Sequence, residues 1–118
     1  MHEMGIALEV IKIAIASIPL DMKGARVAQV NLKVGKLSAV VPDSLRFCFD
    51  VAGKDTALAG AELIIEEIPV RIRCRDCQAE WRVETPAFRC RECDSGSVEI
   101  VSGRELDIRS IEIEENVI

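Results

Sequence analysis

The amino-acid sequence predicts an α+β fold in which two helices pack on a small β-sheet and a cysteine-bearing satellite domain is inserted between two strands of that sheet. Three observations lead to this prediction. Apolar patterns of helical period open the chain and recur near residues 42–53. Segments of strand character follow each pattern and close the chain. Two Cys-x-x-Cys pairs lie within residues 70–98, a stretch nearly free of aliphatic side chains.

The first helix is expected from about residue 3 to Ile18, where Pro19 ends it. Its apolar stripe comprises Met4, Ala7, Leu8, Ile11, Ala14, Ile15 and Ile18. The opposite, solvent-facing side carries His2, Gly5, Glu9, Lys12 and Ala16. Ile6 and Ile13 border this polar side and are expected under a neighbouring helix, with a partner surface as the alternative. Because His2 falls on the solvent-facing side, the chain's single histidine is expected to lie outside the core.

A half-buried strand is expected at residues 26–35, where Ala28, Val30, Leu32 and Val34 alternate with more polar positions. Pro42 and Asp43 suit the start of the second helix, and Gly53 suits its end. Its apolar stripe, Leu45, Cys48, Phe49 and Ala52, makes Cys48 a core residue rather than a metal ligand.

Two further strands are expected at residues 61–70 and 105–114. The alternation of the last strand changes phase between Ile108 and Ile111, which a β-bulge near Arg109 and Ser110 would repair. The satellite between these strands cannot build a core of its own. We therefore expect two domains, one formed by residues 1–69 plus 99–118 and the other by residues 70–98.

The charge balance of 15 basic and 20 acidic residues gives a net charge of -5, which argues against nucleic-acid binding through a basic surface. The most apolar run, from Gly5 to Leu20, is short for a membrane span and is interrupted by Glu9 and Lys12. It also lacks the basic start and cleavage pattern of a signal peptide. These features favour a cytoplasmic protein that binds neither nucleic acid nor membrane.

The two cysteine pairs, Cys74 with Cys77 and Cys90 with Cys93, are separated by twelve residues. A two-residue gap lets both thiolates of a pair reach one ion, and two such knuckles complete a tetrahedral S4 site typical of zinc. Four protein ligands leave no open position, so the ion is expected to be structural and to hold the satellite together. A redox dithiol, two disulfides or an iron site of rubredoxin type remain alternatives.

A zinc knuckle commonly places a small or left-handed residue directly after its second cysteine. Gln78 and Asp94 occupy these two positions, and asparagine or aspartate tolerates that backbone conformation better than glutamine does. The satellite is thus expected to be zinc-ribbon-like. Its six arginines and five acids between Val70 and Ser95 make it near neutral, whereas a zinc ribbon that binds nucleic acid is expected to be more basic.

A histidine at position two can chelate a metal together with the chain terminus. The Met1 amine, the His2 amide nitrogen and the His2 imidazole form two fused rings around one ion, and the Glu3 amide can supply a fourth nitrogen. Such a planar nitrogen set suits Ni(II) or Cu(II) and suits zinc poorly. The alternative is a frayed terminus with an incidental histidine.

Several segments together resemble the HypA/HybF family of hydrogenase maturation proteins: "MHEMGIALEV", "VGKLSAVVPDSLRFCFD", the C-x2-C-x12-C-x2-C satellite and "GRELDIRSIEIE". The resemblance covers nearly the whole chain in order. It implies a nickel site at Met1, His2 and Glu3, with Asp43 nearest to an acidic residue that some members contribute. It also implies zinc ligands at Cys74, Cys77, Cys90 and Cys93.

The same resemblance implies a nickel metallochaperone with no catalytic activity of its own. Such a protein would work with the GTPase HypB to place nickel in the large subunit of [NiFe]-hydrogenase, and in some organisms it also serves urease. The sequence leaves open whether the chain forms a homodimer. The alternative function is a zinc-ribbon interaction module with an incidental terminus.

Overall fold

The computed structural model describes residues 3–84 and 88–114, and the chain divides into two compact units. The first unit takes in Met1–Leu32, Val40–Glu66 and Asp107–Ile118, and the second takes in Lys33–Ala39 and Glu67–Leu106. The elements in chain order are α1 (Glu3–Ala16), η1 (Leu20–Met22), β1 (Val27–Gly35), η2 (Lys36–Ser38), α2 (Pro42–Gly53), β2 (Glu62–Ile68), β3 (Val70–Cys74), β4 (Glu80–Val83), β5 (Val98–Ser102) and β6 (Leu106–Ile113).

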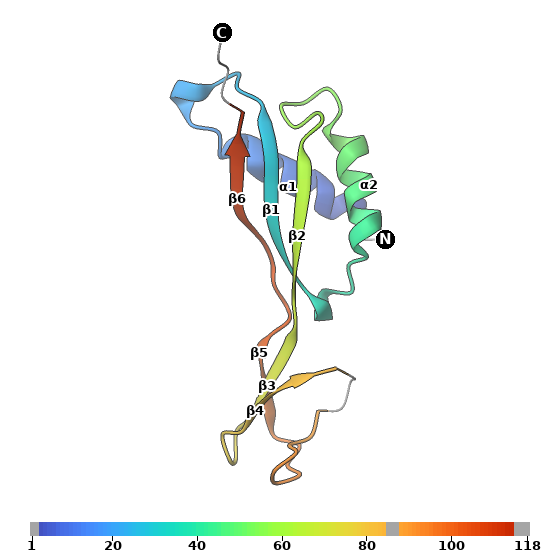
Figure 1. Ribbon diagram of the computed structural model, residues 1–118, viewed down its shortest axis with the longest axis vertical. Coiled ribbons are helices and arrows are strands. Elements are labelled where there is room, and N and C mark those ends of the chain that lie inside the picture. The colour runs from blue at the N-terminus through green and yellow to red at the C-terminus, as the bar shows by residue number, and fades with distance from the viewer. Residues whose placement is uncertain (1–2, 85–87, 115–118) are drawn as a thin grey trace. The chain divides into compact units, whose positions relative to one another are not determined.

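The first unit is built on a three-stranded sheet of order β2-β1-β6. Helices α1 and α2 cover one face of this sheet and contact each other (Figure 1). Among its described residues, the buried apolar side chains of this unit are Ala7, Val10, Ile11, Ala14, Val27, Val30, Leu32, Leu45, Cys48, Phe49, Leu58, Ala61 and Leu63. Between β2 and β6 the chain runs through β3, β4 and β5, so the predicted α+β class with an inserted satellite is confirmed.

Helix α1 buries a different stripe from the one that the sequence predicts. The side chains of Leu8 and Ile15 are 55% and 42% exposed, so their placement in the core was wrong, whereas Val10 is buried. The buried stripe runs through Ala7 and Ala14, whose small side chains allow close packing. The helix is apolar around much of its circumference, and periodicity alone cannot select which stripe packs inward.

The polar side of α1 is exposed at Gly5, Glu9, Lys12 and Ala16, as predicted. Neither of the two isoleucines beside it is fully covered: Ile6 is half-buried and Ile13 is exposed. The helix ends at Ala16, where the backbone N–H of Ser17 still donates to the Ile13 carbonyl.

Helix α2 and strand β1 follow the sequence expectation closely. Pro42 is the first helical residue of α2, and the extended backbone of Val41 precedes it. Leu45, Cys48 and Phe49 are buried along α2, and Val30, Leu32 and Val34 are buried along β1. Cys48 is therefore a core residue. Ala28 is exposed, in contrast to the predicted alternation.

The expected strand at residues 61–70 is divided into β2 and β3 at Pro69, which cannot donate a backbone hydrogen bond. In the second unit β3 pairs antiparallel with both β4 and β5, giving the order β4-β3-β5. The register places Ile72 opposite Trp81 on one side and Ile100 on the other. The bulge expected near Arg109 and Ser110 stays a prediction.

The second unit is larger than the expected 70–98 segment because short backbone bonds join its flanking residues. The N–H of Gly35 donates to the Glu105 carbonyl at 2.6 Å, and the N–H of Leu37 donates to the Gly103 carbonyl at 2.8 Å. The buried apolar side chains of this unit, among the residues described, are Val34, Val70, Ile72, Cys74 and Cys90. Such a small core leaves the unit dependent on a further source of stability.

Gly35 and Gly103 allow the backbone to pack tightly at this point of the second unit. A Cβ atom added to Gly35 would overlap the carbonyl group of Gly103 and approach the backbone nitrogen of Arg104 at 2.5 Å. Gly103 has a φ of +117°, which L side chains rarely adopt. Both positions therefore require glycine.

We predict that Gly35→Ala destabilises the zinc-loaded protein by about 3 kcal/mol or more, because backbone atoms must move to admit the methyl group. Gly96→Ala is the matched control, since a Cβ there meets no atom within 4 Å and the backbone is not left-handed. Urea denaturation followed by circular dichroism measures both variants. Equal stability of the two would contradict this packing.

Candidate functional site

The four cysteines predicted as zinc ligands lie together. The Sγ atoms of Cys74, Cys77, Cys90 and Cys93 all lie within 4.8 Å of one another, and they form the metal-ligating cluster found among the described residues. Two separations across the knuckles are short: 3.5 Å between Cys74 and Cys93, and 3.4 Å between Cys77 and Cys90. Tetrahedral zinc with bonds of about 2.3 Å requires sulfur separations of roughly 3.8 Å. The cluster therefore fits a structural zinc ion.

The two knuckles share one backbone geometry. Gln78 and Asp94 follow the second cysteine of their knuckles and have φ values of 67° and 59°. The N–H of each donates to the carbonyl of the first cysteine, at 3.0 Å to Cys74 and 2.9 Å to Cys90. Both positions thus adopt the left-handed conformation that the sequence predicts for a zinc knuckle, including the less tolerant glutamine.

Backbone N–H groups also point at the first sulfur of each knuckle. The N–H of Cys77 donates to the Cys74 sulfur at 3.5 Å. The Cys90 sulfur accepts from the N–H groups of Glu92 at 3.3 Å and Cys93 at 3.5 Å. Hydrogen bonds of this kind stabilise a thiolate and orient it toward a metal.

The pKa values of the thiols diverge because four sulfurs share a small volume. Burial raises the pKa of the Cys90 thiol, but the N–H groups of Cys93 and Glu92 outweigh it and lower that pKa to about 7. The N–H of Ser95 lowers the pKa of Cys93, yet its contact with the Cys74 sulfur and burial raise it to about 12. The N–H of Ala79 lowers the pKa of Cys77, and its contact with Cys90 together with burial leaves it raised.

Zinc binding requires thiolates, so the ion must displace the protons of Cys77 and Cys93. Zinc affinity therefore rises with pH. Cys74 and Cys90 are buried and Cys77 and Cys93 are exposed, so the site has one covered side and one open side.

Four ion pairs lie among the described residues of the second unit. Ion pairs join Arg71 to Glu80, Arg73 to Glu99, Arg82 to Glu84 and Arg89 to Asp94. All are partly or fully exposed, so each contributes little to stability. They neutralise four of the six guanidinium groups between Val70 and Ser95, which agrees with the expectation that this segment is not a basic nucleic-acid surface.

Of the predicted nickel residues, Met1 and His2 lie outside the described part of the chain, and Glu3 is the first residue of α1. The Glu3 Oε2 accepts a hydrogen bond from the Val41 N–H at 3.4 Å. Val41 is the residue before α2, so this bond holds the start of α1 beside the start of α2. A carboxylate there also interacts favourably with the α2 macrodipole.

Asp43 lies in the first turn of α2, at the same helix end that Glu3 contacts. Its carboxylate pairs with Arg46 at 3.2 Å, and its side chain is 97% exposed. As a candidate nickel ligand, Asp43 was identified only through the family resemblance. The hydrogen bond between Glu3 and Val41 was not predicted from the sequence. That bond joins residues 38 positions apart, and no local pattern signals it.

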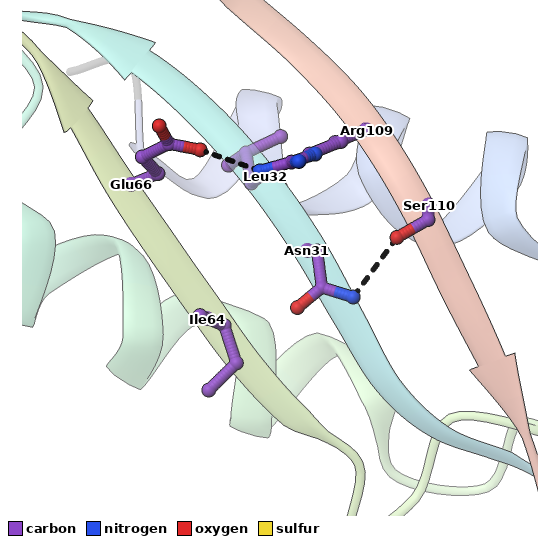
Figure 2. Close-up of a pocket in the computed structure, with 6 residues that line it drawn as sticks. All are labelled: Asn31, Leu32, Ile64, Glu66, Arg109 and Ser110. Atoms are coloured by element: carbon purple, nitrogen blue, oxygen red, sulfur yellow. Dashed lines mark hydrogen bonds and ion pairs between the residues drawn. The ribbon is translucent and has the colours of Figure 1, made fainter.

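The sheet face turned away from the helices has a shallow depression of about 340 Å³ (Figure 2). Asn31 donates to the Ser110 hydroxyl at 3.0 Å, and Arg109 pairs with Glu66 at 3.1 Å, so its polar groups satisfy one another. No nucleophile with an adjacent base lines it. Among the helices described, none combines the length and apolar character that a membrane span requires.

Removing zinc is predicted to unfold the β3–β5 region locally, because the metal contributes on the order of 10 kcal/mol to a segment with few buried side chains. Amide hydrogen exchange after chelation should show lost protection in β3, β4 and β5, with α2 and β1 still protected. Cys93→Ser should lose zinc and reproduce this pattern. Cys48→Ser, which alters a buried cysteine outside the cluster, should retain zinc. Unchanged protection in β3–β5 after chelation would show that the metal is not structural.

Relatives of known family match the chain along nearly its whole length. A hydrogenase maturation factor HypA from Desulfosudis oleivorans is 56% identical over 115 residues, covering 98% of this chain and all of that one. A HypA protein from Desulfatibacillum aliphaticivorans is 53% identical, covering 96% of this chain and 87% of the relative.

Two solved structures share the fold. The solution structure of a HypA protein aligns with a TM-score of 0.63 at 23% identity, covering 89% of this chain and 92% of that one. The solution structure of the Ni metallochaperone HypA from Helicobacter pylori aligns with a TM-score of 0.55 at 22% identity, covering 90% and 95%. The family model described as "Hydrogenase/urease nickel incorporation, metallochaperone, hypA" matches residues 1–113. The chain therefore belongs to the HypA family of nickel metallochaperones for hydrogenase maturation.

Proposed function

We propose that this protein binds Ni(II) at its amino terminus through Met1, His2 and Glu3 and hands it to a hydrogenase precursor. The observation that carries the proposal is the family match, which begins at Met1 and so includes the opening Met-His-Glu. The terminal amine, the imidazole and ionised backbone amides form the planar nitrogen set that Ni(II) accepts. Such a site releases its ion more readily than a closed S4 site does.

Two features of the described residues support this assignment. The polar side of α1 is exposed at Gly5, Glu9 and Lys12, and helical phase assigns position two to that side. The Val41 N–H donates to one oxygen of the Glu3 carboxylate, and we assign the Glu3 backbone nitrogen as its contribution to a planar chelate. Asp43 is the candidate for an additional oxygen ligand at the same end of α2.

The remaining parts of the proposal rest on the family. The protein works with a HypB-type GTPase and delivers nickel to the large subunit of [NiFe]-hydrogenase in the cytoplasm, with urease as a second recipient. It is no enzyme itself. The zinc-binding domain, proposed from the sequence as residues 70–98, lies within the second unit and has Cys74, Cys77, Cys90 and Cys93 as its ligands. The nickel-binding domain is built on the first unit. A second copy of this chain is a further candidate partner, which would give a homodimer.

Nickel titration of the untagged protein tests the terminal chelate. We predict that His2→Ala weakens nickel binding at least about tenfold, because it removes the imidazole and opens one chelate ring. A tag placed before Met1 should weaken binding similarly, since it blocks the amine. Binding should also weaken as the pH falls toward and below about 6.5, where imidazole gains a proton.

The matched control is Glu9→Ala, an exposed position on the same helix that should bind nickel like the parent. If His2→Ala binds nickel as tightly as Glu9→Ala, the terminal site is wrong, and a zinc-ribbon interaction module becomes the better reading of the chain.

Substitution of Glu3 separates backbone from side-chain ligation. Glu3→Gln keeps a side-chain oxygen for the Val41 N–H, whereas Glu3→Ala removes it and is predicted to cost about 0.5–1 kcal/mol of stability. Both variants keep the backbone nitrogen, so both should retain nickel binding by calorimetry. Loss of binding in both would show that the carboxylate is a nickel ligand.

A further inference from the structure

We propose that the open side of the four-cysteine cluster makes zinc retention sensitive to hydroperoxides, and that oxidation links the two knuckles by a disulfide between them. The inference concerns the zinc cluster alone and does not depend on nickel binding. It rests on how the four cysteines differ in exposure and on the separations of their sulfur atoms.

Exposure divides the cluster into two kinds of cysteine. Cys77 and Cys93, the second cysteine of each knuckle, are exposed, whereas Cys74 and Cys90 are buried. The first sulfurs also accept backbone N–H groups, three in all between them. We therefore expect a dissolved oxidant to react first at the two exposed cysteines, Cys77 and Cys93.

Once the first cysteine is oxidised and no longer binds the ion as a thiolate, the separations indicate which sulfur completes the reaction. The Sγ atom of Cys77 lies 3.4 Å from that of Cys90, and the Sγ atom of Cys93 lies 3.5 Å from that of Cys74. Each of these short pairs joins one knuckle to the other and combines an exposed cysteine with a buried one. Each exposed cysteine thus has a resolving partner across the cluster.

The chemistry balances with a hydroperoxide as the oxidant. The exposed thiolate attacks the peroxide oxygen, an S–O bond forms, the O–O bond breaks, and the leaving alkoxide or hydroxide takes a proton from water. The resulting sulfenic acid is attacked by the buried thiolate, an S–S bond forms, and hydroxide leaves and is protonated to water. Two thiolates, one hydroperoxide and two protons give a disulfide, an alcohol or water, and water. Two of the four zinc ligands are consumed, so the ion is released.

The experiment treats the zinc-loaded, untagged protein with hydrogen peroxide and follows zinc release with a chromogenic chelator. Remaining thiols are then alkylated, and the protein is digested with a protease that cleaves after glutamate. Cleavage after Glu67, Glu80, Glu84, Glu92 and Glu99 leaves Cys74 and Cys77 on one peptide, 68–80, and puts Cys90 and Cys93 on separate peptides, 85–92 and 93–99. A disulfide between knuckles therefore joins peptide 68–80 to one of the other two, whereas a disulfide within a knuckle closes peptide 68–80 on itself or joins 85–92 to 93–99, and fragmentation of peptide 68–80 distinguishes Cys74 from Cys77.

We expect about one zinc ion released for each equivalent of peroxide consumed, and disulfides joining Cys77 to Cys90 or Cys74 to Cys93. Cys48, buried in the first unit, should oxidise at least about tenfold more slowly. The Cys48→Ser variant should release zinc at the parental rate. Thiol reductant with added zinc should restore the metal content.

Other outcomes would overturn the proposal. Disulfides within a knuckle, Cys74 to Cys77 or Cys90 to Cys93, would show that the short cross-knuckle pairs do not direct the reaction. Oxidation of Cys48 ahead of the cluster, or full zinc retention while peroxide is consumed, would show that the open side does not expose the ligands.

Discussion

Convergence of four cysteine sulfurs on one point is the constraint on which the second unit depends. Few of its described side chains are buried, and two of these belong to the cluster itself, Cys74 and Cys90. Its sheet of β4, β3 and β5 is short, and its ion pairs are exposed. A metal bound by both knuckles supplies what this part of the chain cannot obtain by burying apolar surface.

The two proposed metal sites differ in the chemistry of their ligands, and this difference matches their roles. Four thiolates enclose zinc without an open position, which suits an ion that stays. The amino terminus offers nitrogen donors that compete with protons, which suits an ion that must leave. In the first unit, the bond from Val41 to Glu3 fixes the start of α1, so that a terminal chelate would project from an ordered helix. A chaperone needs both properties: a stable fold and an exchangeable cargo site.

Much of this could be predicted from the sequence, because the strongest signals are local. The cysteine spacing predicted the cluster, and Pro42 and Gly53 predicted the limits of α2. The buried stripe of α1 could not be predicted from the sequence, because the helix is apolar on several sides. The stripe that packs inward is the one that contains the two small residues Ala7 and Ala14. The Glu3–Val41 bond and the packing of Gly35 against Gly103 depend on residues distant in sequence, so no local pattern reports them.

The most direct test of the two separate metal sites is X-ray absorption at the nickel and zinc edges. The untagged protein is loaded with both metals for this measurement. We predict a zinc spectrum with four sulfur ligands at about 2.3 Å and a nickel spectrum with nitrogen and oxygen ligands only. Sulfur bound to nickel, or nitrogen replacing sulfur at zinc, would contradict the assignment of separate structural and cargo sites.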